Sequence, residues 1–312
     1  MIKVDYSIIV PVWNEEKNIP LLYRELKGEF KRLRKSYEII FVDDGSTDNS
    51  IKILKKLHKT DKKLKIIQFR KHYGKSAALS AGFTHAKGNY IITMDGDLQD
   101  DPREIPNFIK KLKEGPDLVV GWRFHRESPI TKRLPSKIFN KLTSFVTGVR
   151  IHDSNCGFKI FRRDVIKELN LYGELHRYIP ALLHWNGFHV DEIKVKHRRR
   201  KYGKSKFGAM RLIRGFLDLM SVKFLMLYAR RPLHLFGSLG LFFLTVGFLI
   251  GLYMTYLWFL GMRVWDRPLL ILAVLLMVMG TQFISIGLLG EMITSSQEKL
   301  VKEYRIRNIF KN

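Results

Sequence analysis

Short apolar runs separated by amphipathic segments make up the first part of the chain. Runs rich in β-branched and aromatic residues begin at Tyr6, Tyr37, Lys65, Asn89 and Asp117, and each is typical of a buried strand. Segments with helical character lie between these runs. The alternation predicts an α/β fold with a doubly wound, mostly parallel sheet. In such sheets, ligands bind beyond the carboxyl ends of the strands.

The pattern continues beyond residue 150. Segment 153–161 is typical of a loop that enters a strand, and 189–196 is predicted to form another strand. Over 207–228, apolar residues recur at helical spacing, which predicts an amphipathic helix. Such a helix lies on a membrane surface or packs on a core, and both interpretations stay open.

Two long stretches near the end of the chain carry no charged residue. They cover residues 235–262 and 268–290, and each exceeds the ~20 residues that a helix needs to cross a bilayer. A short polar turn, 263–267, separates them, which predicts a transmembrane hairpin. Two buried helices of a soluble core are the alternative, but core helices rarely stay uncharged over this length.

Basic residues flank the predicted hairpin on one side of the membrane. They are Arg230, Arg231, Lys299, Lys302, Arg305 and Arg307. The positive-inside rule places this side in the cytoplasm. We therefore expect a multi-pass protein of the cell membrane with both termini cytoplasmic. The first apolar run is short, contains Asp5 and stops at Pro11, so we expect no signal peptide.

Composition narrows the class of partner. The chain has 312 residues, is 46% hydrophobic and carries a net charge of +26. A basic chain suits nucleic acid, anionic lipid or phosphorylated substrates, and the predicted hairpin favours the last two. Many of the lysines lie on predicted solvated helix faces. The single cysteine, Cys156, excludes an internal disulfide and fits a reducing compartment.

A cluster of acidic residues follows the strand predicted at 89–93. Asp95 and Asp97 are two residues apart, and Gly96 allows a tight turn between them. Two neighbouring carboxylates with a carbonyl oxygen from Gln99 suit Mg²⁺ or Mn²⁺, which substrate phosphates would complete. The alternative is a strand-to-helix turn in which Asp101 caps a helix that begins at Pro102.

Several further candidates fall at the same edge of the predicted sheet. Asp43, Asp44 and Lys75 follow strands, as Asp95 and Asp97 do, so the pattern indicates one site built from several loops.

Basic residues supply candidate phosphate ligands. Arg123, Arg133 and Ser136 are candidates for binding one phosphate together, because arginine offers a planar fork of donors. A solvated basic helix is the alternative. The basic loop 197–206 suits either a diphosphate or anionic headgroups.

Two common nucleotide-binding motifs are missing. No Gly-x-Gly-x-x-Gly follows the first strand, which disfavours a dinucleotide site. The segment 73–76 ends in Gly-Lys-Ser but lacks the upstream glycine of a Walker A loop.

Four motifs together resemble those of family 2 glycosyltransferases with a GT-A fold. The chain is most similar to polyprenyl-phosphate hexose synthases, including dolichyl-phosphate mannose synthase and bacterial polyprenyl-phosphate glucosyltransferases with two C-terminal transmembrane helices. The resemblance covers about residues 5–210. Its motifs are Val10-Pro11-Val12-Trp13-Asn14-Glu15, Asp43-Asp44-Gly45-Ser46, Asp95-Gly96-Asp97-Leu98-Gln99 and Gly157-Phe158-Lys159.

The resemblance implies a domain division. It predicts a GT-A catalytic domain at 1–206, a juxtamembrane amphipathic helix at 207–231, two transmembrane helices within 232–292 and a basic cytoplasmic tail at 293–312.

The resemblance also implies roles for individual residues. Nucleotide-site residues are Pro11, Trp13, Glu15, Asp43, Asp44, Lys75, Asp95, Arg200, Ser205 and Lys206, with Lys75 the weaker candidate. Metal ligands are Asp95, Asp97 and Gln99. Catalytic residues are Asp97, Asp153, Arg123, Arg133 and Ser136, of which the last three match the segment that grips the lipid phosphate.

The implied reaction is an inverting transfer of a hexose from a nucleotide diphosphate sugar to polyprenyl phosphate, undecaprenyl or dolichyl. Asp153 lies where some relatives are assigned a base, and we expect it to orient the acceptor. UDP-glucose is the first choice of donor, because Gly45-Ser46-Thr47-Asp48 stands where mannose synthases often have Ser-Pro-Asp-Gly.

Alternatives remain at three levels. GDP-mannose or another UDP-sugar would serve the same reaction. A processive polysaccharide synthase is a different class, but the chain lacks its Gln-x-x-Arg-Trp signature. A non-enzymatic, membrane-tethered nucleic-acid binder would explain the charge but not the acidic turn, so we expect no nucleic-acid partner. A homo-oligomer is compatible with the sequence.

Overall fold

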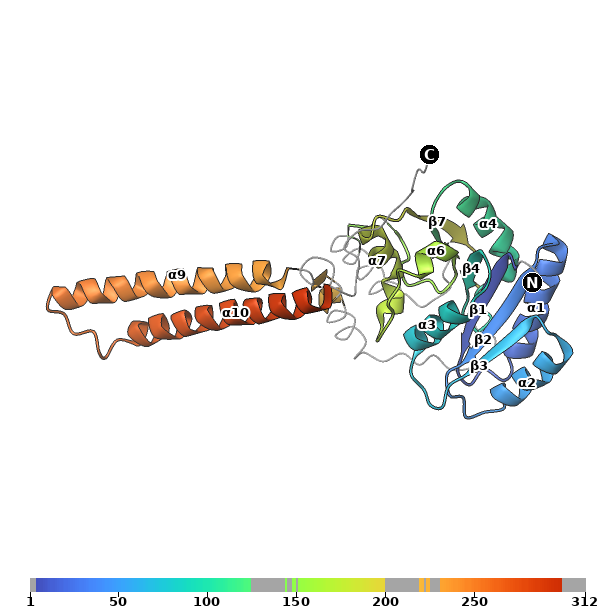
Figure 1. The fold of residues 1–312 in the computed structure, drawn as a ribbon, viewed down its shortest axis with the longest axis horizontal. Coiled ribbons are helices and arrows are strands. Elements are labelled where there is room, and N and C mark those ends of the chain that lie inside the picture. Colours follow the sequence, from blue (N-terminus) through green and yellow to red (C-terminus); the bar gives the residue numbers. More distant parts are fainter. Residues whose placement is uncertain are drawn as a thin grey trace. The chain divides into compact units, whose positions relative to one another are not determined.

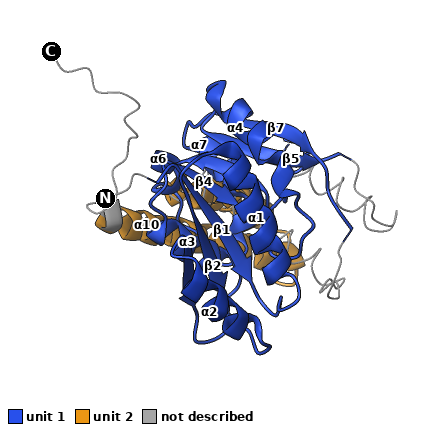
Figure 2. Cartoon of the chain, turned by 90° about the vertical axis from the view of Figure 1, so that its right-hand side faces the viewer, with its two compact units in different colours: residues 1–219 blue, residues 220–312 orange. Residues whose placement is uncertain are grey.

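The computed structural model divides the chain into two compact units, residues 1–219 and 220–312, which are described separately (Figure 2). The described residues are 4–124, 144, 148–149, 151–199, 219–221, 223–224 and 231–298.

The first unit is built on a seven-stranded sheet in the order β3-β2-β1-β4-β6-β5-β7. Only β6 runs antiparallel to its neighbours, so the sheet is mostly parallel, as the sequence predicts. The strands are β1 (Tyr6–Val12), β2 (Tyr37–Asp43), β3 (Leu64–Gln68), β4 (Tyr90–Thr93), β5 (Leu118–Arg123), β6 (Lys159–Arg162) and β7 (Val190–Val195).

Helices cover both faces of this sheet (Figure 1). In that view α1 and α2 lie on one face of β1–β3, and α3 lies on the other. The helices are α1 (Ile19–Leu33), α2 (Ser50–Thr60), α3 (Lys75–His85), α4 (Ile105–Lys113), α6 (Arg163–Ile166) and α7 (Ile179–Trp185), with short 3₁₀ turns η1 (Pro102–Glu104) and η2 (Leu175–Arg177).

The central strands form the core. Ile8 and Ile9 of β1 and Ile40 and Phe41 of β2 are completely buried, because helices pack against both faces of the sheet. This explains why these strands are continuous apolar runs. Since β6 is antiparallel, its first residue, Lys159, lies opposite Thr93 at the carboxyl edge of the sheet.

The start of η1 tests the predicted cap. Asp101 accepts a hydrogen bond from the backbone N–H of Arg103 at 3.0 Å, so the capping role is confirmed. Asn18 stands before α1 but makes no capping hydrogen bond; its side-chain amide donates to Glu15 instead.

The second unit contains a helical hairpin of α9 (Pro232–Phe259) and α10 (Pro268–Glu298). Both are long and apolar enough to cross a membrane, and only 11% of the most apolar window of each is buried within the structure. A soluble core would bury such helices, so this finding favours the membrane hairpin. Near the open end, Glu291 accepts a hydrogen bond from the backbone N–H of Leu233 at 3.3 Å.

Glycines set how closely the two helices approach. A Cβ on Gly240 would lie 2.6 Å from the Gly280 carbonyl oxygen, and one on Gly247 would lie 2.8 Å from the Ala273 carbonyl oxygen. Small residues at these positions let the backbones pack directly against one another, as in many membrane helix pairs.

The predicted domain boundaries stay predictions. Most of 207–231 and all of 299–312 lie outside the described residues, and the orientation of the hairpin in a membrane is likewise untested.

Candidate active site

The acidic turn after β4 is held at the carboxyl edge of the sheet. Asp97 is 8% exposed, and one of its oxygens accepts a hydrogen bond from the backbone N–H of Gln99 at 3.2 Å. Between them, Leu98 adopts a left-handed conformation with φ of 63°. The sequence predicts that Gly96 permits the tight turn, but the residue with positive φ is Leu98.

Gly96 and Gly157 are required for a different reason, close packing. A Cβ on Gly96 would lie 2.8 Å from a methyl group of Val12. A Cβ on Gly157 would lie 2.6 to 2.7 Å from the carboxylate atoms of Asp95. The two glycines therefore leave room for the acidic turn between β1 and the loop before β6.

Lys75, at the first position of α3, forms an ion pair with Asp95. Burial opposes ionisation of Asp95, but the adjacent ammonium group lowers the pKa of its carboxyl to about 2. Lys75 was the weaker nucleotide-site candidate from the sequence, and the structure places it in direct contact with the acidic turn.

A third carboxyl group stands behind the first two. Asp100 is 4% exposed and accepts a hydrogen bond from the backbone N–H of Asp95 at 3.1 Å. Burial, together with the nearby charge of Asp95, raises the pKa of Asp100 to about 7. Asp100 therefore resists ionisation behind the other two carboxyl groups.

The donor set of the turn fits a hard divalent cation. Among the described residues no three Asp, Glu, His or Cys side chains form a complete metal site. Mg²⁺ is usually held by only one or two carboxylates and completed by substrate phosphates. The two carboxylates of Asp95 and Asp97 with the amide oxygen of Gln99 match this requirement.

Arg123 and Asp153 form a pair that the sequence analysis treated as two separate residues. The Arg123 Nε and Nη2 atoms donate to the two carboxylate oxygens of Asp153 at 2.6 and 2.8 Å. Their side chains are 12% and 11% exposed. Burial lowers the pKa of Arg123, but the hydrogen bonds and charge of Asp153 outweigh it and raise that pKa. Both oxygens of Asp153 are thereby engaged.

Asp44 orders the loop that precedes α3. Its carboxylate accepts hydrogen bonds from the backbone N–H groups of Tyr73 at 2.7 Å and Gly74 at 2.9 Å, and it lies 2.9 Å from His72 Nδ1. The His72 ring stacks on Trp13 with centroids 4.0 Å apart. Trp13 and Asp44 are therefore joined through one residue, His72, which the sequence analysis did not single out.

Three further nucleotide-site candidates lie on β1, on β2 and in the loop that follows β1. Asp43 is fully buried at the end of β2, and burial raises the pKa of its carboxyl. Pro11 lies within β1 opposite Val42. The backbone N–H of Glu15 donates to Ser50 Oγ at 2.9 Å, which joins the loop that follows β1 to the first residue of α2.

Two other residues near the site were missed by the sequence analysis. Lys159 is 4% exposed and donates to the Cys156 carbonyl; burial lowers the pKa of Lys159 to about 8. His176 lies 3.0 Å from Ser76 Oγ, and burial, followed by the charge of Lys75, lowers its pKa well below the usual value. Lys159 belongs to a quoted motif, whereas nothing in the sequence marks His176.

Five predicted site residues cannot be placed. Arg133, Ser136, Arg200, Ser205 and Lys206 lie outside the described residues. Their roles stay predictions.

The family comparison defines the class of protein, a glycosyltransferase. The model of glycosyl transferase family 2 matches residues 7–169, and the chain belongs to this family.

Similar proteins with curated names narrow the class. The chain is 38% identical to dodecaprenyl-phosphate galacturonate synthase of Rhizobium johnstonii, over 98% of this chain and 93% of the relative. It is 37% identical to undecaprenyl-phosphate 4-deoxy-4-formamido-L-arabinose transferase of Shewanella sediminis, over 92% of this chain and 86% of the relative.

Solved structures confirm the GT-A fold. Glucosyl-3-phosphoglycerate synthase from Mycobacterium tuberculosis, solved with Mn²⁺, UDP and phosphoglyceric acid, superposes with a TM-score of 0.53 at 17% identity, over 69% of this chain and 78% of that one. A mannosyltransferase from Pyrobaculum calidifontis, solved with GDP-mannose and Mn²⁺, gives 0.51 at 20% identity, over 70% and 66%.

Proposed function

We propose that this glycosyltransferase moves one sugar from a nucleotide diphosphate donor to polyprenyl phosphate with inversion at the anomeric carbon. The proposal rests on the acidic turn and the Arg123–Asp153 pair, which lie at the same edge of the sheet, where the charge of Arg123 acts on Asp95. The chain also carries a hairpin long and apolar enough to cross a membrane. The named relatives support a polyprenyl phosphate acceptor.

Asp95, Asp97 and Gln99 would hold Mg²⁺ or Mn²⁺, and a bound cation would neutralise the charge of the leaving diphosphate. Lys75 lies against the same turn and would contribute a further positive charge beside the diphosphate. Trp13, with Pro11, Glu15, Asp43 and Asp44, would bind the nucleoside beyond the ends of β1 and β2.

Arg123 would bind the acceptor phosphate together with Arg133 and Ser136. The pairing with Asp153 fixes the Arg123 guanidinium and leaves its Nη1 atom outside that pair of hydrogen bonds. A phosphate monoester has a second pKa of about 6, so it is mostly a dianion at neutral pH. It therefore needs no strong base, and Asp153 would act by orienting Arg123 and the acceptor.

In the transfer, an acceptor phosphate oxygen forms a bond to the anomeric carbon. The bond from that carbon to the diphosphate oxygen breaks, and the nucleoside diphosphate leaves with the electron pair. Bringing one anion to another is opposed by Coulomb repulsion, so positive side chains and correct positioning would supply most of the rate enhancement.

The identity of the donor sugar is a separate and more specific proposal. UDP-glucose remains the first choice from the sequence, and other UDP-sugars and GDP-mannose are the alternatives. The relatives named for galacturonate and formamido-arabinose favour including nucleotide-linked uronic acid and formamidopentose donors in the test.

The experiment is a transfer assay with the detergent-solubilised chain, undecaprenyl phosphate and a panel of radiolabelled nucleotide sugars. We expect one donor to label the lipid, and Asp97→Ala to abolish transfer while the thermal unfolding stays close to that of the unaltered protein. Full activity of Asp97→Ala would refute the metal assignment. No transfer from any donor, with tight salt-dependent RNA binding, would refute the enzymatic function.

We also propose that the hairpin places both termini in the cytoplasm, beside the lipid-bound acceptor. A cysteine introduced by Asp266→Cys, in the turn between α9 and α10, should react with a membrane-impermeant maleimide in intact cells. The native Cys156 is buried and provides the unreactive background. Labelling only after the cells are opened would reverse the orientation.

A further inference from the structure

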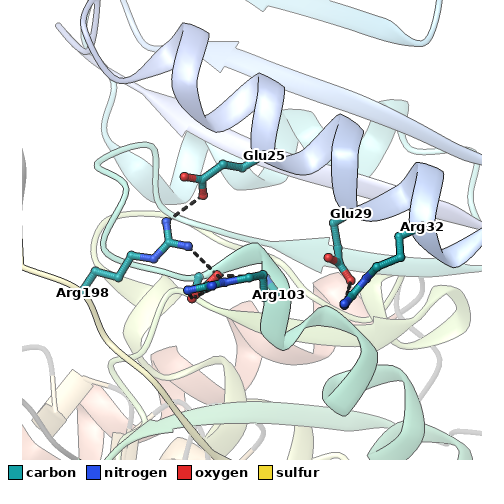
Figure 3. A network of polar contacts seen from close by, with 6 residues as sticks. Glu25, Glu29, Arg32, Arg103 and Arg198 are labelled. Carbon is teal, nitrogen blue, oxygen red and sulfur yellow. Dashed lines mark hydrogen bonds and ion pairs between the residues drawn. The ribbon is translucent and has the colours of Figure 1, made fainter.

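Arg198, three residues beyond the end of β7, joins two distant parts of the first unit. Its Nη1 atom lies 2.7 Å from Glu25 of α1, and its Nη2 atom lies 2.6 Å from Asp101, just after the acidic turn. Figure 3 shows the guanidinium of Arg198 directed to Glu25 on one side and lying beside Arg103 on the other. One guanidinium thus connects α1 to the end of the acidic turn.

The backbone around Arg198 also pairs with the turn. The N–H of Arg198 donates to the Gln99 carbonyl at 2.8 Å, and His197 forms an antiparallel bridge with Asp100. The side-chain amide of Gln99 donates to the Arg198 carbonyl at 3.3 Å. This last contact directs the amide nitrogen of Gln99 toward Arg198, which leaves the amide oxygen on the opposite side.

The carboxylate that receives Arg198 is deeply buried. The Asp101 side chain is 3% exposed, against 29% for Arg198 and 38% for Glu25. A buried carboxylate needs a well-placed cation, and losing the partner of such a group is far costlier than losing a surface ion pair. The contact with Asp101 is therefore the stronger half of the bridge.

Arg103 provides an internal comparison. It also binds Asp101, with its Nη2 atom at 2.7 Å, but its side chain is 72% exposed. The side-chain hydrogen bonds of Arg103 go to Asp101, and Arg103 acts on Glu25 of α1 through its charge. The Arg198 side chain hydrogen-bonds directly to both Glu25 and Asp101, and its backbone pairs with Gln99. Glu29 and Arg32, also drawn in Figure 3, form a pair within α1.

We propose that Arg198 is a positioning residue for the metal and diphosphate site: it fixes the Gln99 amide and the end of the acidic turn against α1 before ligands bind. This inference rests on the proposed function, because it acts through Gln99. Residues that hold a metal ligand in place order that ligand before the metal binds. Their loss typically weakens metal binding by roughly 10- to 100-fold. A lysine offers one point charge and cannot bridge two separate carboxylates with a rigid fork.

The test compares Arg198→Gln and Arg198→Lys with Glu25→Gln and the matched control Arg103→Gln. Affinity for Mn²⁺ in the presence of UDP is measured by calorimetry. Steady-state kinetics separate kcat from the KM for the donor, and hydrogen exchange follows amides 97–101 in the metal-free protein.

For Arg198→Gln we expect an approximately tenfold or greater loss of Mn²⁺–UDP affinity, a raised donor KM and faster exchange in the turn. Arg198→Lys should recover part of the affinity, and Glu25→Gln should show a smaller loss. Arg103→Gln should stay within about twofold of the unaltered chain, although it removes an ion pair from the same carboxylate.

Equal affinity and equal exchange in Arg198→Gln and Arg103→Gln would overturn the inference. If Arg198→Gln does not fold, Arg198→Lys and Glu25→Gln decide the question by the same criteria. If the unaltered chain neither binds Mn²⁺ with a nucleotide nor transfers a sugar, the proposed function fails. Hydrogen exchange in the metal-free turn would then still show whether Arg198 orders it.

Discussion

The strand-edge site and the membrane-type hairpin both depend on glycines that have no room for a side chain, but the neighbours differ. At the site, Gly157 lies against the carboxylate of Asp95. In the hairpin, Gly240 lies against a backbone carbonyl of the opposite helix. The first contact places a charged group, and the second lets two helices approach. The same substitution should therefore affect activity in one region and stability in the other.

The largest effect is expected at Gly157. In Gly157→Ala the new methyl group would displace the Asp95 carboxylate, because it would otherwise lie within 2.7 Å of it. A displacement near 1 Å in a catalytic site costs on the order of 100-fold in rate. We expect a loss of this size in kcat/KM, measured in the transfer assay, with a melting temperature within a few degrees of the original. Unchanged kinetics would show that the position of Asp95 does not limit the reaction.

The second prediction concerns the hairpin. Gly240→Leu should separate α9 from α10 and destabilise the hairpin by about 1–3 kcal/mol, a typical cost of overpacking. Unfolding in mixed detergent micelles measures the change. Gly251→Leu is the matched control, because a Cβ at Gly251 meets nothing within 4 Å. If both variants unfold alike, the glycine contact does not hold the helices together.

The sequence predicted the sheet well because buried parallel strands are continuous apolar runs. It also predicted a common edge of the sheet for five site residues, since the carboxyl ends of parallel strands meet there. These residues are Asp43, Asp44, Lys75, Asp95 and Asp97. The sequence did not reveal which side chains pair. Arg123 and Asp153 are 30 residues apart, and their contact depends on β6 entering the sheet antiparallel between β4 and β5.

The sequence likewise does not show why a glycine is required at a given position. Gly96 and Gly157 both belong to recognisable motifs, but motif membership does not tell a turn from a close approach. Only the structure shows that Leu98 carries the positive φ and that Gly157 faces Asp95. Packing distances between segments far apart in the chain decide such cases, and local patterns do not contain them.

A third prediction concerns the opposite edge of the sheet, where the ionised side chain of Glu38 stabilises the fold. Glu38 is 4% exposed and accepts hydrogen bonds from Ser7 Oγ and the Lys87 backbone N–H, both at 2.6 Å, beside Lys65. Burial opposes ionisation, but these partners together lower the pKa of Glu38 below 4.5. The ionised form therefore stabilises the fold above pH 4.5, and this contribution disappears as the pH falls through the lowered pKa.

Glu38→Gln should accordingly reduce the free energy of unfolding by about 1–3 kcal/mol at pH 7, and the difference should shrink below pH 4.5. Urea denaturation of the detergent-solubilised chain at several pH values measures it. The exposed Glu114 supplies the control, since Glu114→Gln should change stability by less than about 0.5 kcal/mol. A difference between Glu38→Gln and the original that is constant with pH would contradict the assignment.

The smallest expected effect is at Gly28, and it tests most directly whether the neighbours of a glycine decide what its substitution does. Gly28 lies in α1, is exposed, and a Cβ there meets nothing within 4 Å. Gly28→Ala should stabilise the protein by about 0.5–1 kcal/mol, because alanine loses less backbone entropy in a helix. Transfer activity should be unchanged. The same one-methyl change should thus lower transfer activity at Gly157 and raise the free energy of unfolding at Gly28. If the two variants have the same transfer activity, contact with Asp95 is not what makes Gly157 necessary.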